Sequence, residues 1–300
     1  MKIKIDRLLL IFILILILLN SFVYTKDAFS QNQKNFIWKV QSETGTVYVL
    51  GSIHFLKKEF YPLNKQIEDA FDKSKFLVVE ANINDLGKVD IEKLLGSAFY
   101  KDEETLKKHI SRETYELVKK ESERIGIPLE FFNKQKPWFL ALTLSSLEMV
   151  NLGFDPNYGI DIYFLSKAAG KKKILELESL DYQIDLLSKF SEKEQEMFLL
   201  YTLKDLNTLG KELDRLIRAW TSGDAKGIES IMTKSIKEDK DLSSVYEKFV
   251  NERNRNMALK IEEFLRTNDA YFVIVGAGHL VGKKGIIEIL KEKGYSVRQL

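Results

Sequence analysis

The stretch Tyr271-Phe-Val-Ile-Val-Gly-Ala-Gly-His279 joins a short apolar run to a glycine-rich loop that ends on a histidine. Five consecutive apolar residues are typical of a strand that is covered on both faces, as in the parallel sheets of α/β proteins. Glycine lets the chain turn sharply where the strand ends. Such sheets place ligand-binding groups in the loops that follow their strands. The stretch therefore predicts a buried strand with His279 just beyond its carboxyl end.

The same pattern occurs near the start of the chain. In Thr46-Val-Tyr-Val-Leu-Gly-Ser-Ile-His54 a predicted strand is followed by a glycine and, three residues later, by a histidine. Two further predicted strands, Phe76-Leu-Val-Val-Glu80 and Ile174-Leu-Glu-Leu-Glu178, end on a carboxylate. If the four strands are parallel, their carboxyl ends share one edge of the sheet. The side chains expected to converge there are His54, Glu80, Glu178 and His279.

The remaining elements predict an α/β fold with a mixed central sheet flanked by helices. Phe36–Val40 forms a predicted hairpin with Thr46–Leu50 through Glu43-Thr-Gly45, and Ser296–Leu300 is a short closing strand. A large helical insertion is expected over residues 85–170 and 180–268. The predicted helices are Asn64–Ser74, Arg112–Arg124, one that begins at Pro137, Leu203–Trp220 and one that contains Val250–Phe264.

Two of these helices carry specific expectations from the spacing of their apolar residues. The residues from Leu203 to Trp220 predict one long helix that ends before Gly223. The helix that begins at Pro137 is expected to bury the stripe Trp138, Leu142, Ser145, Met149 and Leu152.

The composition of the 300-residue chain excludes several classes of protein. Cysteine is absent, so disulfide scaffolds, zinc ribbons, iron–sulfur clusters and cysteine nucleophiles are excluded. Lys and Arg number 46 against 44 Asp and Glu, without basic blocks, which argues against a nucleic-acid partner. Histidine occurs three times, and His109, in a polar stretch, is expected at the surface.

The N-terminus has the pattern of a secretory signal peptide. Lys2, Lys4 and Arg7 precede the apolar run Leu8–Leu19, and Ala28-Phe-Ser30 offers small residues for cleavage. We expect residues 1–30 to be the signal peptide and residues 31–300 a single domain, secreted or held in the periplasm or cell envelope. The alternative is an uncleaved anchor over residues 8–24, which would be the protein's contact with the membrane.

The rare histidines and the strand-end carboxylates are the best candidates for a site. Two imidazoles and one or two carboxylates form a donor set for a divalent metal, or an acid/base pair. A single histidine or glutamate after a strand is more often an ordinary polar turn residue. With only three histidines in the chain, however, the matched positions of His54 and His279 favour a shared function.

Three further polar residues are predicted to support this site. Arg253 and Asn254 lie at helical spacing from Val250 and Met257, so both are expected on the core side of their helix. A buried arginine needs a carboxylate partner or an anionic substrate. Arg253 is therefore expected either to lock its helix to the sheet or to act in catalysis. Asp161 is expected to start a helix or to orient a neighbouring group.

An ordered set of motifs over roughly residues 35–300 resembles the TraB/GumN/Tiki family. The second glycine–histidine block is the most specific of these motifs. The matching segments are Gly51-Ser-Ile-His54, Tyr61-Pro-Leu-Asn64, Leu77-Val-Val-Glu80-Ala, Pro137-Trp138, Tyr158-Gly-Ile-Asp161, Leu177-Glu178-Ser, Gln183, Glu252-Arg253-Asn254, Val275–Gly282 and Gly294-Tyr-Ser-Val.

The resemblance implies a fold similar to that of erythromycin esterase and haem-binding ChaN-type proteins. Because Tiki members resemble divalent-metal-dependent proteases of secreted signalling proteins, it implies an exported metal-dependent hydrolase, a peptidase acting on peptides or on protein N-termini. His54 and His279 would bind Mn²⁺, Co²⁺ or Zn²⁺, with Glu80 as third ligand or general base. Arg253 would stabilise the oxyanion. Residues that would orient their neighbours are Glu178, Asp161 and Asn254.

Two other functions stay open at this point. A metal-free esterase-type hydrolase would use His54 or His279 as general base together with Glu80. A binding module would hold a peptide or a haem-like ligand in the same cleft without turnover. The expected partner is a peptide or a small ester in the hydrolase cases.

Overall fold

The computed structural model describes residues 34–83, 90–234 and 243–300. Its centre is a six-stranded mixed sheet with the order β4-β3-β5-β2-β1-β6, which confirms the predicted α/β class. The predicted signal peptide and the alternative anchor lie outside the described residues. The strands are β1 (Ile37–Gln41), β2 (Thr46–Ser52), β3 (Phe76–Val79), β4 (Lys173–Glu176), β5 (Ala270–Gly276) and β6 (Ser296–Gln299).

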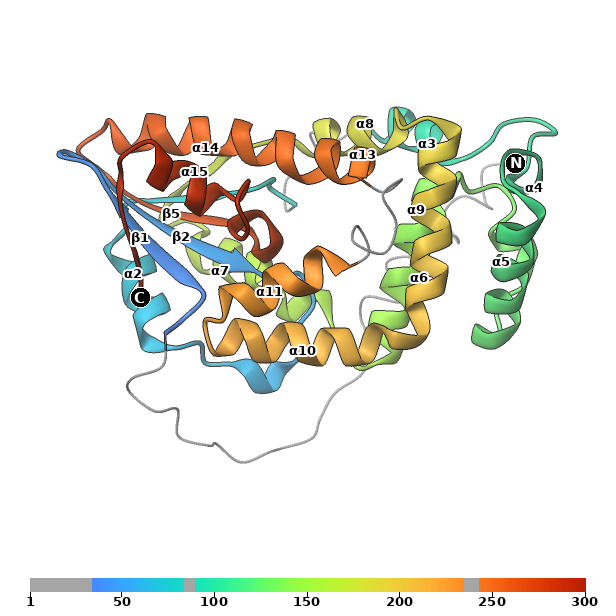
Figure 1. Ribbon diagram of the computed structural model, residues 1–300, viewed down its shortest axis with the longest axis horizontal. Coiled ribbons are helices and arrows are strands. Elements are labelled where there is room, and N and C mark those ends of the chain that lie inside the picture. Colours follow the sequence, from blue (N-terminus) through green and yellow to red (C-terminus); the bar gives the residue numbers. More distant parts are fainter. Residues whose placement is uncertain (1–33, 84–89, 235–242) are drawn as a thin grey trace.

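Helices account for most of the described chain (Figure 1). Short 3-10 turns occur at Lys58–Phe60, Leu129–Phe131, Pro156–Tyr158, Leu206–Thr208 (η5) and Ala277–Leu280 (η8), and a π-helical turn, η7, at Glu247–Asn251. The α-helices are α2 (Lys65–Lys73), α3 (Ile91–Ala98), α4 (Leu106–His109), α5 (Arg112–Ile125), α6 (Pro137–Asn151), α7 (Ile160–Ala168), α8 (Leu180–Ser188), α9 (Glu192–Asp205), α10 (Leu209–Thr221), α11 (Ala225–Met232), α13 (Ser243–Tyr246), α14 (Glu252–Leu265) and α15 (Ile286–Glu292).

Strand β5 is the middle of the parallel part of the sheet. It pairs in parallel with both β2 and β3, and β3 pairs in parallel with β4. Phe272 packs against Phe71 of α2 and Phe164 of α7, with ring centroids 5.5 and 4.8 Å apart. Its neighbour Tyr271 stacks on Phe264 of α14 at 4.6 Å. Successive side chains of a strand point to opposite faces, so helices cover both faces, as the apolar run predicts.

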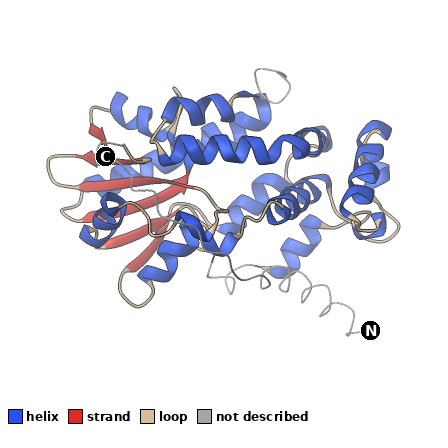
Figure 2. Ribbon diagram, turned by 90° about the horizontal axis from the view of Figure 1, so that it is seen from below, coloured by secondary structure: helices blue, strands red, loops and turns tan. Residues whose placement is uncertain are grey.

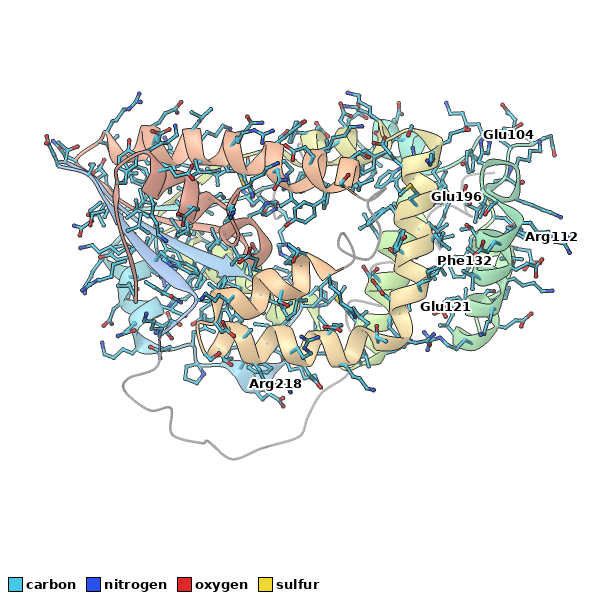
Figure 3. The ribbon with its side chains drawn as sticks, viewed as in Figure 1. Glu104, Arg112, Glu121, Phe132, Glu196 and Arg218 are labelled. Carbon is cyan, nitrogen blue, oxygen red and sulfur yellow. The ribbon has the colours of Figure 1, made fainter. Side chains whose placement is uncertain are left out.

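The helical insertion forms a second packed region at one end of the molecule (Figure 2). Helices α5, α6 and α9 enclose an apolar cluster that is separate from the core of the sheet. Phe132, labelled in Figure 3, lies in this cluster between α9 and α5. Its buried members are Leu106, Val118, Phe132, Leu140, Ala141, Leu144, Leu199, Leu203 and Leu206.

The two specific helix predictions are confirmed only in part: α10 ends at Thr221, before Gly223, and Trp138 of α6 is buried, but the rest of each prediction is wrong for a common reason. The predicted helix Leu203–Trp220 is two helices, α9 and α10, separated by η5. Its first part packs in the insertion and its second part, with Trp220, against the sheet. In α6, Leu142 is exposed, whereas the buried residues include Leu140, Ala141 and Leu144. Apolar spacing identified helical segments in both cases, but it did not identify which core each segment packs against.

Within the described residues, no helix combines the length and the apolar character that crossing a membrane requires.

Gly51 and Gly96 provide a matched test of this packing. A Cβ atom on Gly51 would lie 2.4 Å from Cδ1 of Phe36 and 3.1 Å from the Cα of Ala277, whereas one on Gly96 would meet nothing within 4 Å. Because Phe36 is fully buried, we expect Gly51→Ala to lower the free energy of unfolding by about 1–3 kcal/mol. Gly96→Ala, inside exposed α3, should raise it by up to about 1 kcal/mol. Urea unfolding measures both, and equal midpoints for the two variants would contradict the packing described.

Candidate functional site

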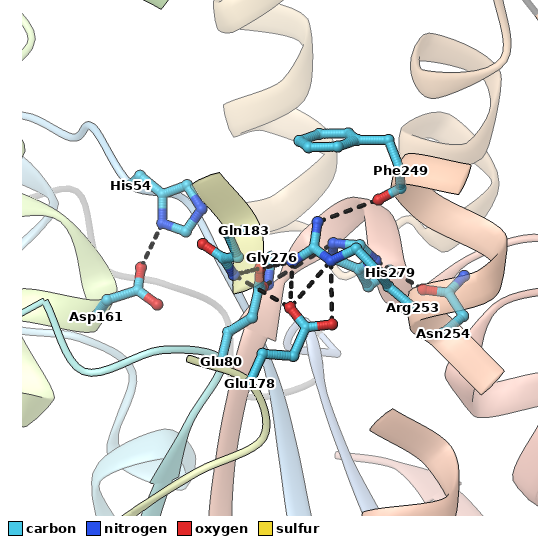
Figure 4. A network of polar contacts seen from close by, with 10 residues as sticks. All are labelled: His54, Glu80, Asp161, Glu178, Gln183, Phe249, Arg253, Asn254, Gly276 and His279. Carbon is cyan, nitrogen blue, oxygen red and sulfur yellow. Dashed lines mark hydrogen bonds and ion pairs between the residues drawn. The ribbon is translucent and has the colours of Figure 1, made fainter. Parts of the chain in front are cut away.

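Four side chains from the ends of parallel strands meet at one edge of the sheet (Figure 4). His54 follows β2, Glu80 follows β3 and Glu178 lies two residues beyond β4. His279 lies in η8, directly after β5. The structure thus brings together the four residues that the sequence pattern places at this edge, and each has a distinct environment.

His54 is paired with an acid but is open to solvent. Its Nδ1 lies 2.7 Å from Oδ2 of Asp161, a buried residue in the first turn of α7. An ionised carboxylate only accepts hydrogen bonds, so Nδ1 donates and Nε2 is the ring nitrogen left for other contacts. The His54 side chain is 61% exposed. The negative charge of Asp161 raises the pKa of His54 to about 9, against the opposing effect of desolvation.

His279 has the same arrangement in a buried setting. Its Nδ1 lies 2.6 Å from Oδ1 of Asn254, and the amide Nδ2 of Asn254 donates to the carbonyl of Lys284 at 2.8 Å. That second bond fixes the amide orientation, so Nδ1 of His279 carries the proton and Nε2 holds a lone pair. Burial lowers the pKa of His279 to about 4. The ring is therefore neutral at neutral pH.

Glu80 lies between the two imidazoles and is ionised. Its Oε2 accepts from the backbone N–H of Gly276 at 3.0 Å and lies 4.0 Å from Nε2 of His279. Its Oε1 accepts from Arg253. Burial by itself would raise the pKa of Glu80, but the charges of His279, Arg253 and His54 outweigh it and hold the pKa near 2.

Arg253 is held in an ion pair with two carboxylates. Its Nε donates to both oxygens of Glu178, at 3.1 and 3.0 Å, and its second terminal nitrogen donates to Glu178 at 2.8 Å and to Glu80. The other terminal nitrogen donates to the carbonyl of Phe249 at 3.1 Å. Arg253 is 2% exposed. The ion pair expected as one of its two roles is therefore present, and it locks α14 to the sheet edge.

Gln183 belongs to the same hydrogen-bond network as Glu80, Glu178 and Arg253, although the sequence predicts no role for it. From the first turns of α8, its Nε2 donates to Oε1 of Glu80 at 2.9 Å and to Oε2 of Glu178 at 3.2 Å. It thereby joins the two carboxylates. Its place in the ordered motif set was the available signal, but nothing in the local pattern of α8 predicts its partners.

A cleft of about 260 Å³ opens beside these residues. Its lining combines polar residues, among them His54, Glu80 and Gln183, with apolar ones, among them Phe55, Pro156 and Ile162. A substrate with both a polar reacting group and an apolar side chain would fit this lining.

The third histidine lies in the helical insertion. His109 is only partly exposed, rather than at the open surface as predicted, because its ring stacks on Tyr100 at 4.3 Å. Its nitrogens lie 3.0 Å from Glu104 and 2.9 Å from Glu192. It borders a separate hollow of about 410 Å³, and its place far from the sheet edge makes it a useful control residue.

The donor types at the sheet edge fit a divalent metal. His54 and His279 each donate through Nδ1 to an oxygen, as metal-binding histidines commonly do, and Glu80 adds a carboxylate. Nε2 of the neutral His279 can ligate directly, whereas Nε2 of His54 can ligate once the imidazolium gives up its second proton. Across residues 34–83, 90–234 and 243–300, however, no three His, Asp or Glu side chains are close enough to form a complete metal site. Binding would require movements that draw Glu80 and the imidazoles together.

The comparisons place the chain in a family. The profile of the TraB/PrgY/gumN family matches residues 36–299, so the chain belongs to this family. An uncharacterized protein of Treponema pallidum is 23% identical over 87% of this chain and 82% of its own. The uncharacterized protein YbaP of Escherichia coli is 24% identical over 81% of this chain and 87% of its own.

One relative carries an activity in its name. A "Metalloprotease TIKI homolog" of Amphimedon queenslandica is 24% identical over 89% of this chain and 62% of its own. None of the solved structures compared matches the chain significantly.

In metal-free buffer, the two histidines should make the free energy of unfolding depend on pH in opposite directions. Between pH 4 and 6.5 the unfolded chain binds a proton at His279 that the native protein does not, so the free energy of unfolding should rise with pH by on the order of 3 kcal/mol. Between pH 6.5 and 9 the native protein holds a proton at His54 that the unfolded chain has lost, so this contribution should fall as pH rises.

Urea unfolding at a series of pH values measures these slopes. His279→Gln should flatten the acidic window and His54→Gln the alkaline one, whereas His109→Gln should leave both in place. Identical profiles for the wild type and the His279 variant would show that the ring is not held neutral.

Substitution of Arg253 tests how much its ion pair with Glu80 and Glu178 contributes to the free energy of unfolding. Arg253→Met leaves Glu80 and Glu178 buried without their cation, so we expect a loss of about 3–5 kcal/mol of stability. Adding Glu178→Met should restore part of this loss, because it removes one unpaired charge. Arg215→Met, which breaks an exposed pair with Glu212, should cost less than about 1 kcal/mol. A similarly small effect at Arg253 would mean that the pair is not buried in solution.

Proposed function

We propose that this TraB/PrgY/gumN protein is an exported metal-dependent hydrolase that acts on peptides. The observation that carries the proposal is the arrangement of His54 and His279 around Glu80. Each histidine has its Nδ1 proton fixed by an acceptor, so each presents Nε2 toward the same sheet edge. Few purely structural roles require two histidines that both donate from Nδ1 beside a buried carboxylate.

His54, His279 and Glu80 would hold Mn²⁺, Co²⁺ or Zn²⁺, which all accept imidazole and carboxylate ligands. When bound, such a metal polarises a carbonyl group and can lower the pKa of a water molecule to about 7. Asp161 and Asn254 would keep the imidazoles in the tautomer that ligation needs. Because a carboxylate with a pKa near 2 is a weak base, the low value favours Glu80 as a ligand over Glu80 as the general base.

Peptide hydrolysis sets the requirements on the remaining groups. The oxygen of water bonds to the carbonyl carbon, the C–N bond breaks, and the proton released by water ends on the amine nitrogen. Arg253 already donates to Glu80 and Glu178, so we propose that it acts mainly by holding these carboxylates in place. Glu178 in turn holds the guanidinium, and Gln183 donates to both carboxylates.

Several features support a peptide as substrate and export as the setting. The named metalloprotease homologue covers most of the chain, and the lining of the cleft contains both polar and apolar residues. Residues 1–30 hold four basic and two acidic side chains, which leaves 42 of each sign in residues 31–300. A neutral domain suits a short peptide better than a polyanion. The basic and apolar N-terminus supports export.

A metal-free hydrolase is the second candidate, and the environment of His54 favours it. With a pKa of about 9 beside Asp161, His54 is an imidazolium at neutral pH and is open to the cleft. It would donate a proton to the leaving group while the ionised Glu80 takes one from water. This route fits a small ester as well as a peptide.

The deciding experiment uses protein expressed from the full-length sequence, a library of quenched fluorescent peptides, and Mn²⁺, Co²⁺ or Zn²⁺ supplied in turn. We expect cleavage that a chelator abolishes and added metal restores. His54→Ala and His279→Ala should each lower kcat/KM by at least about 100-fold, and His109→Gln should stay within about twofold of the wild type.

Each departure from this result has a distinct meaning. Cleavage that resists the chelator but is lost in His54→Ala would favour the metal-free hydrolase. Saturable peptide binding without products would favour a binding module. Full activity of both histidine variants would rule out the site proposed here.

A further inference from the structure

Ser52 presents an unexplained polar group next to the site. Among the buried side-chain nitrogen and oxygen atoms of the described residues, its Oγ is the one without a hydrogen-bond partner. The residue is 3% exposed. Leaving a buried hydroxyl unpaired destabilises a protein, and such groups in native structures call for a ligand, a water or a catalytic role as explanation.

The sheet register shows on which side this hydroxyl lies. Ser52 is the last residue of β2 and pairs with Gly276 of the parallel strand β5. Directly paired residues of neighbouring strands point to the same face of a sheet. A Cβ atom on Gly276 would point at the site, 3.6 Å from Oε2 of Glu80 and 3.9 Å from Nε2 of His54. The side chain of Ser52 therefore leaves the sheet on the face where the candidate ligands lie.

We propose that the hydroxyl of Ser52 hydrogen-bonds to the water that attacks the substrate, held beside Nε2 of His54 and Oε2 of Glu80. This inference rests on the proposed hydrolytic function and adds a catalytic residue to it. The hydroxyl can accept a hydrogen bond from the water or donate one to the water oxygen, so it can orient the lone pair that attacks. The hydroxyl then has no hydrogen-bond partner within the protein because its partner is the attacking water.

The test combines stability with function, because a merely structural serine would behave differently. In chelator-treated protein, Ser52→Ala removes an unpaired buried group, so Tm should stay the same or rise by about 2–4 °C. Ser52→Thr and Ser52→Val form the matched pair, since they have nearly the same shape and differ in the hydroxyl. Any effect of the added methyl groups appears in both.

Titration with Mn²⁺ alone and peptide cleavage give the functional readouts. We expect Ser52→Ala and Ser52→Val to lower Mn²⁺ affinity or kcat by about 10–100-fold, the range usual for groups that hydrogen-bond around a metal site. Ser52→Thr should retain function to within a few fold. KM should change little, because the hydroxyl contacts water rather than the bound peptide.

Three results would overturn the proposal. A Tm lowered by several degrees in Ser52→Ala would reveal a structural partner for the hydroxyl. A wild type that binds Mn²⁺ and cleaves peptide, with unchanged values in Ser52→Val, would remove Ser52 from the mechanism and leave the hydrolase intact. A wild type that neither binds metal nor cleaves would instead overturn the hydrolase itself, and the role of Ser52 with it.

Discussion

The site depends on one buried guanidinium between two carboxylates. Arg253 joins α14 to the loops after β3 and β4, so a single side chain fixes the distance between three elements that are far apart in sequence. It also leaves the charges unequal, since one cation faces the two anions Glu80 and Glu178. A buried excess of negative charge favours a further cation nearby. The same interaction that holds the edge of the sheet together thus favours a further positive charge there, such as the imidazolium of His54 or, as proposed, a metal ion.

The two histidines show how one sequence pattern yields two chemical states. Both follow a strand and a glycine, and both donate from Nδ1. His54 faces the charged Asp161 and solvent, which favours the imidazolium, whereas His279 faces the neutral Asn254 in the interior, which favours the neutral ring. The partner and the depth of burial, rather than the motif, decide the protonation state of each ring.

Sequence alone predicted the sheet edge well because its signals are local. Each strand carries its own apolar run and its own terminal polar residue, and parallel pairing then brings His54, Glu80 and His279 together. The helices were harder, since the apolar residues of α6 occur around most of its surface and the bend at η5 depends on two separate cores. The bridging contacts of Gln183 and the unpaired hydroxyl of Ser52 are tertiary properties, so no local pattern could reveal them.

The position of β5 in the chain has a consequence for how the protein matures. This strand lies at the centre of the sheet and separates β2 from β3, although it follows β1, β2, β3 and β4 in the sequence. Until it is made, the N-terminal strands lack their shared neighbour and His54 lacks its counterpart. Contacts between such distant segments form late and slowly. A polypeptide synthesised from its N-terminus therefore cannot assemble the candidate site until β5 has emerged, so the order of the strands delays the formation of this site.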